Sequence, residues 1–216
     1  MRTNTEAAQL LLLLTWMSPA FPTGAFAYSH GLEWAIDQRV ITTGAELKDW
    51  IADLLTRGSG WNDAVLFARC WEDDAGELNE LALALATSRE RHLETTQIGR
   101  AFRIAAGIFA APTLDDEEIA YPIAAGTACA TMGIDKGQAL LAWLQGSAAT
   151  LTSVAVRLVP IGQTAGLGVL RDLAPVIART AERAAVATLD DLGAITLGAD
   201  IAAMKHETQH SRVFRT

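Results

Sequence analysis

The stretch Ser18–Glu33, SPAFPTGAFAYSHGLE, interrupts a chain that otherwise reads as helices. It contains two prolines, Pro19 and Pro22, and two glycines, Gly24 and Gly31. Proline cannot continue a helix, and glycine lowers the cost of unusual backbone angles. The stretch therefore predicts a shaped connector between two helices. If this connector is a buried turn, its aromatic side chains fill core space. These aromatic residues are Phe21, Phe26 and Tyr28.

Helical signals follow directly after the connector. Thr43 and Glu46 have capping-box spacing, and apolar residues then recur at helical intervals as far as Gly58. Asn62 is predicted to cap a further helix over residues 64–71, because its side-chain oxygen can accept from the first free backbone N–H groups. This part of the chain therefore predicts two consecutive helices.

The middle of the chain predicts a long helical region over residues 77–111. A joint is expected at Thr87, because Thr87 and Glu90 again have capping-box spacing. Residues 112–118 read as a polar break.

Two further helices are predicted after this break. Residues 121–132 are rich in alanine and contain Gly126, which suits a helix packed closely against another. Asp135 is predicted to cap a helix that runs through Leu158 with an apolar stripe along one side.

The last third of the chain is expected to break at Pro160 and Gly162. Two helices that meet at Pro175 are predicted next, since proline suits the first turn of a helix. The chain shows no convincing alternating strands and no repeat of fixed period. The sequence therefore predicts an all-α fold, a single-domain bundle of about eight to ten helices, given a mean helix length of ~11 residues.

Composition narrows the function classes. Of 216 residues, 50% are hydrophobic and 19% are charged, which is apolar enough to suggest that a partner covers part of the surface. The formal net charge of -8 argues against a general nucleic-acid binder, which would present excess cations to phosphates. Cys70 and Cys129 lie far apart and form no CxxC pair, as expected in a reducing cytosol.

The N-terminus resembles an export signal in one respect. Residues 10–14 are all leucine, and residues 25–27 resemble a cleavage site. However, Glu6 offsets the single positive charge of Arg2, whereas an export signal needs net positive charge there. No apolar run approaches the ~20 residues needed to span a bilayer. The sequence therefore predicts a soluble, cytoplasmic protein with no membrane partner.

Two catalytic patterns are missing. Residues 162–168 contain three glycines but not the lysine of a phosphate-binding loop, so binding of GTP or ATP is not expected. Ser29 and His30 are neighbours, but adjacent helical side chains point in different directions, and no GxSxG elbow exists. The sequence therefore supports neither a nucleotide hydrolase nor a serine hydrolase.

Residues 206–210, HETQH, match HExxH, in which two helical histidines hold zinc and the glutamate serves as general base. A zinc protease needs a third protein ligand, usually well downstream. Only residues 211–216 follow, and none of them is a usual zinc ligand, while the upstream candidates His30 and His92 belong to no zinc motif. A zinc-dependent hydrolase therefore remains an alternative. Its metal candidates, His206 and His210, could also hold nickel weakly.

Four segments together resemble the signatures of the urease accessory protein F family. They are residues 18–33, quoted above, residues 88–102 (SRERHLETTQIGRAF), residues 156–167 (VRLVPIGQTAGL) and residues 204–216 (MKHETQHSRVFRT). The second keeps the Gln-x-Gly-x-Ala-Phe element as Gln97, Gly99, Ala101 and Phe102. The third keeps a basic residue before Pro-x-Gly-Gln. Because the four segments occur in order and span the chain, the resemblance covers essentially all of it.

The charged residues of the second segment also have a purely structural interpretation. They can form a solvated helix face with weakly stabilising ion pairs. These residues are Arg89, Glu90, Arg91 and Glu94.

The resemblance implies an all-α homodimer without enzymatic activity. Proteins of this family act with accessory protein D, also called H (UreD or UreH), and with the GTPase accessory protein G (UreG) to load nickel into apo-urease. On this view the chain is an adaptor that recruits or regulates the GTPase. No cofactor is expected to bind tightly, because nickel is handled by the complex.

The resemblance also assigns residues. Glu33, Arg157 and Gln163 are expected on the surface that faces protein G, where opposite charges set register and partner choice. Residues 1–203 are expected to form the helical domain, and residues 204–216, here called the tail, to bind protein D and organise the dimer. The tail residues assigned to these contacts are His206, Glu207, Gln209, Ser211, Arg212, Phe214 and Arg215. The residues of the first signature assigned a structural role are Pro22, Gly24, Tyr28, Ser29, His30 and Gly31.

Two features of the tail need separate mention. The family more commonly has tyrosine where His210 stands, so one aromatic-to-histidine difference accounts for the HExxH match. The tail is expected to be mobile in the isolated protein, because a short polar terminus buries too little surface to offset its ordering entropy.

Three hypotheses follow for function. An adaptor for nickel insertion predicts that Glu33→Ala and Arg157→Ala lower urease activation while leaving the fold and binding of protein D intact. A zinc hydrolase predicts activity that depends on Glu207. A passive scaffold that only stabilises protein D predicts that D is captured with this chain and G never is.

Overall fold

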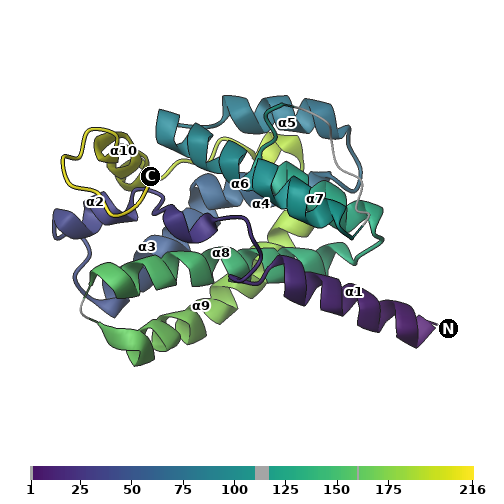
Figure 1. Cartoon of the computed structure of the whole chain (residues 1–216), viewed down its shortest axis with the longest axis horizontal. Helices are drawn as coiled ribbons and strands as arrows, with labels where there is room; N and C mark the ends of the chain where they lie inside the picture. The colour runs from purple at the N-terminus through teal and green to yellow at the C-terminus, as the bar shows by residue number, and fades with distance from the viewer. Residues whose placement is uncertain (1, 110–116, 160) are drawn as a thin grey trace.

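A computed structural model describes residues 2–109, 117–159 and 161–216. Within these ranges it contains ten α-helices, two short 3₁₀ helices and no strand (Figure 1). The α-helices are α1 (Arg2–Trp16), α2 (Leu32–Asp37), α3 (Gly44–Arg57), α4 (Ser59–Arg69), α5 (Ala75–Ala84), α6 (Arg89–Gly107), α7 (Tyr121–Thr131), α8 (Lys136–Leu158), α9 (Gly162–Ala185) and α10 (Leu197–His206). The 3₁₀ helices are η1 (Ala25–Ala27) and η2 (Leu189–Asp191). The predicted all-α bundle is confirmed.

Helix α4 lies at the centre of the bundle. It packs against α3, α5, α7, α8 and α9, and Figure 1 shows α5, α6 and α7 on one side of it and α8 and α9 on the other. Residues 64–68 of α4 are all buried. A helix that is apolar on every side must be enclosed by neighbours, which is how the core is closed here.

Most of the predicted helix starts are confirmed. Thr43 accepts a hydrogen bond from the Glu46 N–H, and Glu46 accepts one from the Thr43 N–H. Asp135 caps α8 by accepting from the Gln138 N–H. The joint within the long middle region is also present, but α6 is capped by Ser88 instead of Thr87.

The predicted cap at Asn62 is wrong. Asn62 is a buried residue inside α4, which begins three residues earlier, at Ser59. Its side chain accepts from the N–H groups of Gly193 and Ala194, so it ties α4 to the segment before α10. Asn62 therefore serves these long-range hydrogen bonds and not a helix cap, as expected for a buried polar side chain, which needs hydrogen-bond partners.

The predicted division at Pro175 is also wrong, because α9 continues through it. Proline inside a helix removes one hydrogen bond and crowds the preceding turn, at a cost of ~3 kcal/mol. Leu173 and Ile177, on either side of Pro175, are both buried against the bundle. Burial of this continuous stripe outweighs the lost hydrogen bond, which local sequence signals do not show. Pro160 and the polar break over residues 112–116 lie outside the described residues.

Pro175→Ala is expected to stabilise the protein. Alanine restores the N–H that the Arg171 carbonyl lacks, a gain of ~3 kcal/mol, and loses the stiffness that proline gives the unfolded chain, ~0.4–1 kcal/mol. The side chain is exposed, so no packing is lost. The free energy of unfolding, measured in urea, is expected to rise by about 2 kcal/mol. An unchanged or lower value would contradict this account of α9.

Helix α8 contains an apolar run of membrane-spanning length, contrary to the expectation from the sequence. It has 23 residues, and its most apolar window is hydrophobic enough to cross a bilayer by length and composition, so an apolar run of spanning length does exist. In the structure α8 packs against α9, α7, α4 and α3, and it buries Leu140, Leu144 and Ala148. Its apolar character is that of a core helix.

Two glycines permit close packing of α7. A Cβ atom on Gly126 would lie 2.8 Å from the Cys70 Sγ atom, and one on Gly99 would lie 2.1 Å from the Ile119 carbonyl oxygen. The predicted close contact at Gly126 is confirmed. The thiols of Cys70 and Cys129 are free, and burial raises the pKa of each to about 12.

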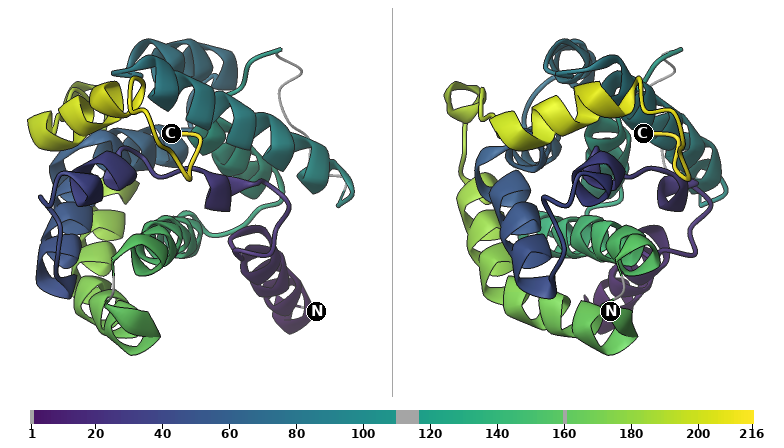
Figure 2. Two further views of the ribbon diagram at one scale, coloured as in Figure 1. Left: turned by 60° about the vertical axis from the view of Figure 1, so that its left-hand side comes forward. Right: turned by 90° about the vertical axis from the view of Figure 1, so that its left-hand side faces the viewer.

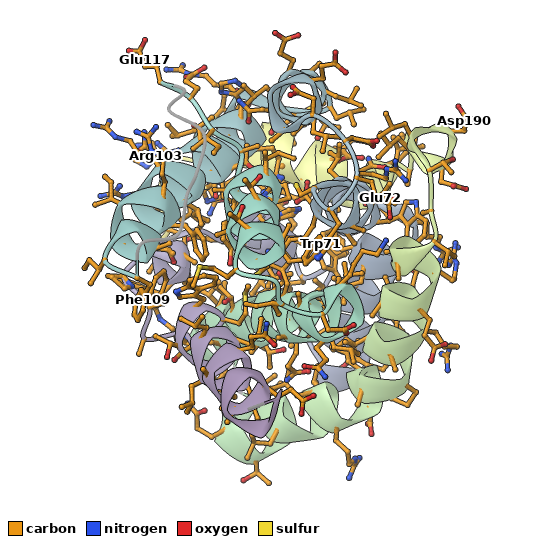
Figure 3. The ribbon with its side chains drawn as sticks, turned by 90° about the vertical axis from the view of Figure 1, so that its right-hand side faces the viewer. Trp71, Glu72, Arg103, Phe109, Glu117 and Asp190 are labelled. Atoms are coloured by element: carbon orange, nitrogen blue, oxygen red, sulfur yellow. The ribbon has the colours of Figure 1, made fainter. Side chains whose placement is uncertain are left out.

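The end of α4 is joined to the start of α8. The indole N–H of Trp71 donates to the Ile134 carbonyl oxygen at 3.2 Å, and Glu72 pairs with Lys136 at 2.7 Å. Figure 3 shows Trp71 and Glu72 on the face that also carries α1, with Glu117 and Asp190 at its outer edges.

The connector between α1 and α2 has the predicted irregular shape. Gly24 and Gly31 have φ of 71° and 75°, and His30 has φ of 55°, all in the left-handed region. Phe21 and Tyr28 are buried as expected. Phe26 is 66% exposed, so its predicted role in the core is wrong.

Candidate functional site

The tail folds back onto the bundle. Its first three residues complete α10, and the last ten, Glu207–Thr216, here called the closing segment, run across to the connector (Figure 2). Phe214 and Thr216 are buried. The Arg215 N–H donates to the Ala27 carbonyl oxygen at 2.8 Å. The buried Glu33 carboxylate binds the main chain of the tail. The expected mobility of the tail in the isolated chain stays a prediction. The predicted boundary at 203/204 falls inside α10.

Glu33 provides the strongest of these attachments. Its carboxylate accepts hydrogen bonds from the N–H groups of Val213 and Phe214 at 2.7 and 2.9 Å. Glu33 itself is 5% exposed, at the start of α2. Its side chain therefore faces the tail and not the solvent, contrary to its predicted place on an exposed surface.

His206 lies fully buried between two glutamates. Its Nδ1 atom is 2.8 Å from Glu90 Oε2, and its Nε2 atom is 3.1 Å from Glu33 Oε2. Arg212 reaches the other oxygen of Glu90 at 3.0 Å. These four residues, Glu33, Glu90, His206 and Arg212, are here called the anchor cluster. Burial raises the pKa of the Glu90 carboxyl, while the contacts with His206 and Arg212 act in the opposite direction.

This arrangement contradicts a zinc site in HExxH. Helix α10 ends at His206, so His210 lies beyond the helix and is exposed, and the two histidines do not share a helix face. Both ring nitrogens of His206 are already engaged, with the two carboxylates on opposite edges of the ring. In the part of the chain that the structure describes, no group of acidic, histidine or cysteine side chains is arranged to hold a metal ion.

Of the other residues of the closing segment, some form hydrogen bonds and some are exposed to solvent. Glu207 accepts from the Arg89 N–H at 3.0 Å, which fixes the segment to the start of α6. Gln209 donates to the Ser211 carbonyl oxygen. Ser211 is exposed, as are Arg212 and Arg215.

Phe214 brings Glu33 and Arg157 together. The guanidinium of Arg157 lies 4.7 Å from the centre of the Phe214 ring, a cation–π contact, while the Phe214 N–H binds Glu33. Arg157 also donates to the Phe26 carbonyl oxygen at 3.3 Å and is otherwise exposed. Gln163 lies exposed at the start of α9.

The Ser29–His30–Gly31 turn contacts both the end of the closing segment and α10. The Ser29 N–H and hydroxyl both donate to the main-chain oxygen of Thr216. A Cβ atom on Gly31 would lie 2.6 Å from the Ala203 nitrogen, so α10 approaches here as only glycine permits. The connector is thus shaped to receive the end of the chain. Tyr28 is buried beside it, and Pro22 is exposed.

His30 belongs to a second cluster of polar side chains, here called the inner cluster, which consists of half-buried His30 and Asp63 and buried Arg91 and Glu94. Its Nδ1 atom lies 3.4 Å from Glu94, and its Nε2 atom lies 2.8 Å from the Ser59 hydroxyl. Arg91 bridges Glu94 at 2.9 Å and Asp63 at 3.5 Å. Burial alone would raise the pKa of Glu94, but the charges and hydrogen bonds of Arg91 and His30 outweigh burial and bring it to about 2. Burial raises the pKa of Asp63.

A cavity of about 190 Å³ adjoins the inner cluster. Aromatic side chains form much of its wall, and exposed Phe26 and Arg157 also line it. The aromatic residues of the wall include Trp16, Tyr28, Tyr121 and Trp143.

Three charged residues of α6 are buried, contrary to their interpretation as part of a solvated helix face. Glu90, Arg91 and Glu94 were expected on a solvated face, and all three are at most 8% exposed. A signal was present, because Glu90 and Glu94 continue the i, i+4 stripe of buried Ile98 and Phe102 toward the start of the helix. Carboxylates in phase with an apolar stripe indicate buried acceptors, and their partners in the tail are distant in sequence.

Comparison with known proteins identifies the family. A family model described as UreF matches residues 41–174. The chain belongs to the UreF family. The urease accessory protein UreF of Brucella ovis is 46% identical over 221 aligned positions, which cover 99% of this chain and 97% of that protein. The UreF 1 protein of Brucella anthropi is 45% identical, with 99% and 96% covered. The UreF of a Bradyrhizobium species is 44% identical, with 99% and 95% covered.

Membership of the UreF family excludes one of the three hypotheses, the zinc hydrolase. Proteins of this family are accessory proteins and not catalysts, so this chain is not an enzyme. The zinc-hydrolase hypothesis is wrong on both grounds, the family and the engagement of His206.

Proposed function

We propose that this UreF protein is a cytoplasmic, homodimeric adaptor for assembly of the urease nickel centre. It binds accessory protein D (UreD or UreH) through its tail and recruits or regulates the GTPase UreG, and nickel reaches apo-urease through this complex. No nucleic acid or membrane takes part. The proposal is supported by relatives that are named urease accessory proteins and that align with this chain over nearly their whole length.

One structural observation supports the adaptor over a passive scaffold. The tail assigned to protein D lies directly beside Arg157, an exposed residue assigned to UreG, since the Arg157 guanidinium lies over the Phe214 ring. Exposed basic and apolar side chains surround this point. They are Phe26, Arg157, Arg212, Val213 and Arg215. Arginine and aromatic side chains are the residue types that most often dominate binding energy at protein interfaces.

Arg157→Ala is the variant that tests this proposal. The side chain is exposed, so its loss leaves the buried core intact. Loss of an interface arginine costs ~1–2 kcal/mol, so capture of UreG is expected to weaken by about 5- to 30-fold while capture of protein D is retained. Nickel per urease active site, measured after co-expression with the urease genes, is expected to fall in parallel.

Arg171→Ala provides the matched control. Arg171 is also an exposed arginine, but its side chain pairs with its neighbour Asp172 on α9. This variant is expected to keep normal capture and normal nickel content. If Arg157→Ala behaves like Arg171→Ala, the assignment of Arg157 is wrong. If the unmodified chain captures protein D and never UreG, the passive scaffold is correct.

A further inference from the structure

The anchor cluster places both nitrogens of one imidazole against carboxylate oxygens. His206 is 0% exposed, and Glu33 and Glu90 are 5% and 6% exposed, so water cannot replace either contact. A neutral imidazole has one N–H donor and one acceptor, whereas an ionised carboxylate only accepts. With a neutral ring and two ionised glutamates, one of the two contacts would set an acceptor against an acceptor at about hydrogen-bond distance.

The observed geometry therefore requires one more proton than a neutral His206 with ionised Glu33 and Glu90 would hold. The extra proton can reside on the ring, giving an imidazolium that donates to both glutamates, or on one glutamate, which then donates to the ring. In both cases every buried polar atom of the contact is satisfied. The closed arrangement and the extra proton are thus linked.

The proton also controls the closing segment. Glu33 holds the segment directly through the N–H groups of Val213 and Phe214, and His206 is the last residue before it. Without the extra proton, two buried carboxylates would repel each other around a ring that can satisfy only one of them. Release of the segment exposes the cluster and relieves both penalties.

We propose that the closing segment, Glu207–Thr216, is a proton-linked latch, which takes up one proton when it closes over the anchor cluster and opens as the pH rises. When the closed form binds one proton more than the open form, the ratio of open to closed rises by up to about tenfold per pH unit. Low pH therefore favours the closed form. This regulatory device does not depend on the identity of any partner.

The charged groups around the ring agree with this direction. Glu33 faces it from α2 and Glu90 from α6, while Arg212 and Glu207 of the closing segment act on Glu90. Burial raises the pKa of the Glu90 carboxyl, so the closed form holds a proton there more tightly than an exposed glutamate would. By linkage, this contribution favours closure at low pH and is lost as the pH rises.

The test uses amide exchange of Val213 and Phe214 in the full-length protein, followed by NMR between about pH 6 and about pH 9, where imidazoles commonly lose their proton. Each rate is divided by that of a free peptide of sequence 207–216 at the same pH, which removes the chemical pH dependence of exchange. Protection of both amides is expected to fall with rising pH by up to about tenfold per unit. Protection that stays constant would overturn the proposal.

Glu90→Gln is the decisive variant. The glutamine amide can donate to Nδ1 of a neutral ring while Nε2–H donates to Glu33, so no extra proton is needed. Protection of Val213 and Phe214 is expected to persist at high pH. His210→Gln, which removes an exposed histidine of the same segment, should keep the pH dependence of the unmodified protein. A Glu90→Gln protein with unchanged pH dependence would overturn the proposal.

A second measurement needs no substitution. The ring ¹⁵N shifts and coupled protons of His206 are expected to show either two N–H groups, or one N–H group with a protonated glutamate, while the segment is closed. A neutral His206 beside two ionised glutamates, with both amides still protected, would overturn the proposal even if Glu90→Gln fails to fold.

Discussion

Replacing Glu33 by alanine is expected to detach the closing segment and to lower the free energy of unfolding by roughly 3–5 kcal/mol, the usual cost of breaking a buried ion pair. The substitution leaves the N–H groups of Val213 and Phe214 without their acceptor and His206 without one of its two partners. Urea unfolding measures the stability. Trypsin cleavage after Arg212 measures the exposure of the segment.

Glu80→Ala is the control for this variant, because Glu80 is an exposed glutamate on α5. It is expected to change the stability by less than about 0.5 kcal/mol. A Glu33→Ala protein that matches this control in both measurements would show that the Glu33 contacts do not hold the segment.

The position of Glu33 also changes what its substitution can say about function. The sequence alone predicts that Glu33→Ala leaves the fold and binding of protein D intact. Since Glu33 binds the main chain of the tail, its loss is expected to disturb the surface proposed for D as well. Arg157, whose side chain lies on top of Phe214, separates the two partners more cleanly.

Gly99→Ala is expected to destabilise the protein by about 3 kcal/mol or more, the upper range for overpacking. Its new Cβ atom would lie 2.1 Å from the Ile119 carbonyl oxygen and 2.9 Å from the Tyr121 nitrogen. Both are main-chain atoms at the start of α7, so α6 and α7 must move apart. The free energy of unfolding and the midpoint of thermal unfolding measure this cost.

Gly107→Ala is the matched control, because Gly107 is in the same helix and has no atom within 4 Å of its would-be Cβ. It is expected to raise stability by up to ~1 kcal/mol through helix propensity. If both alanine variants are stabilised alike, α6 and α7 are not held as closely as the structure shows.

Local signals predicted the helices well where the cap and the stripe lie near each other in sequence. The Thr43–Glu46 box and the Asp135 cap are examples, and both are confirmed. The failures at Asn62 and Pro175 have a shared cause. In each case a long-range contact, to residues 193–194 or to the bundle core, decides the role of a residue whose neighbours suggest another.

The candidate site was predicted in parts but not as an assembly. The resemblance selected Glu33, His206 and Arg212, but no local pattern predicts that Glu90 joins them from a helix more than a hundred residues before the tail. Charged residues are mostly exposed, so a solvated face was the natural prediction for α6. The i, i+4 stripe of α6 indicates that Glu90 is buried but not which residues it contacts, because its partners come from the end of the chain.

The two unreactive thiols have a practical consequence. Maleimides react with the thiolate form of cysteine. Cys70 and Cys129, with pKa values of about 12, are therefore not expected to react with maleimides at neutral pH. A single cysteine introduced at Val213, which is 69% exposed, would then accept a fluorophore selectively. Movement of the chain end could be followed by energy transfer or anisotropy in otherwise natural protein, during assembly with its partners.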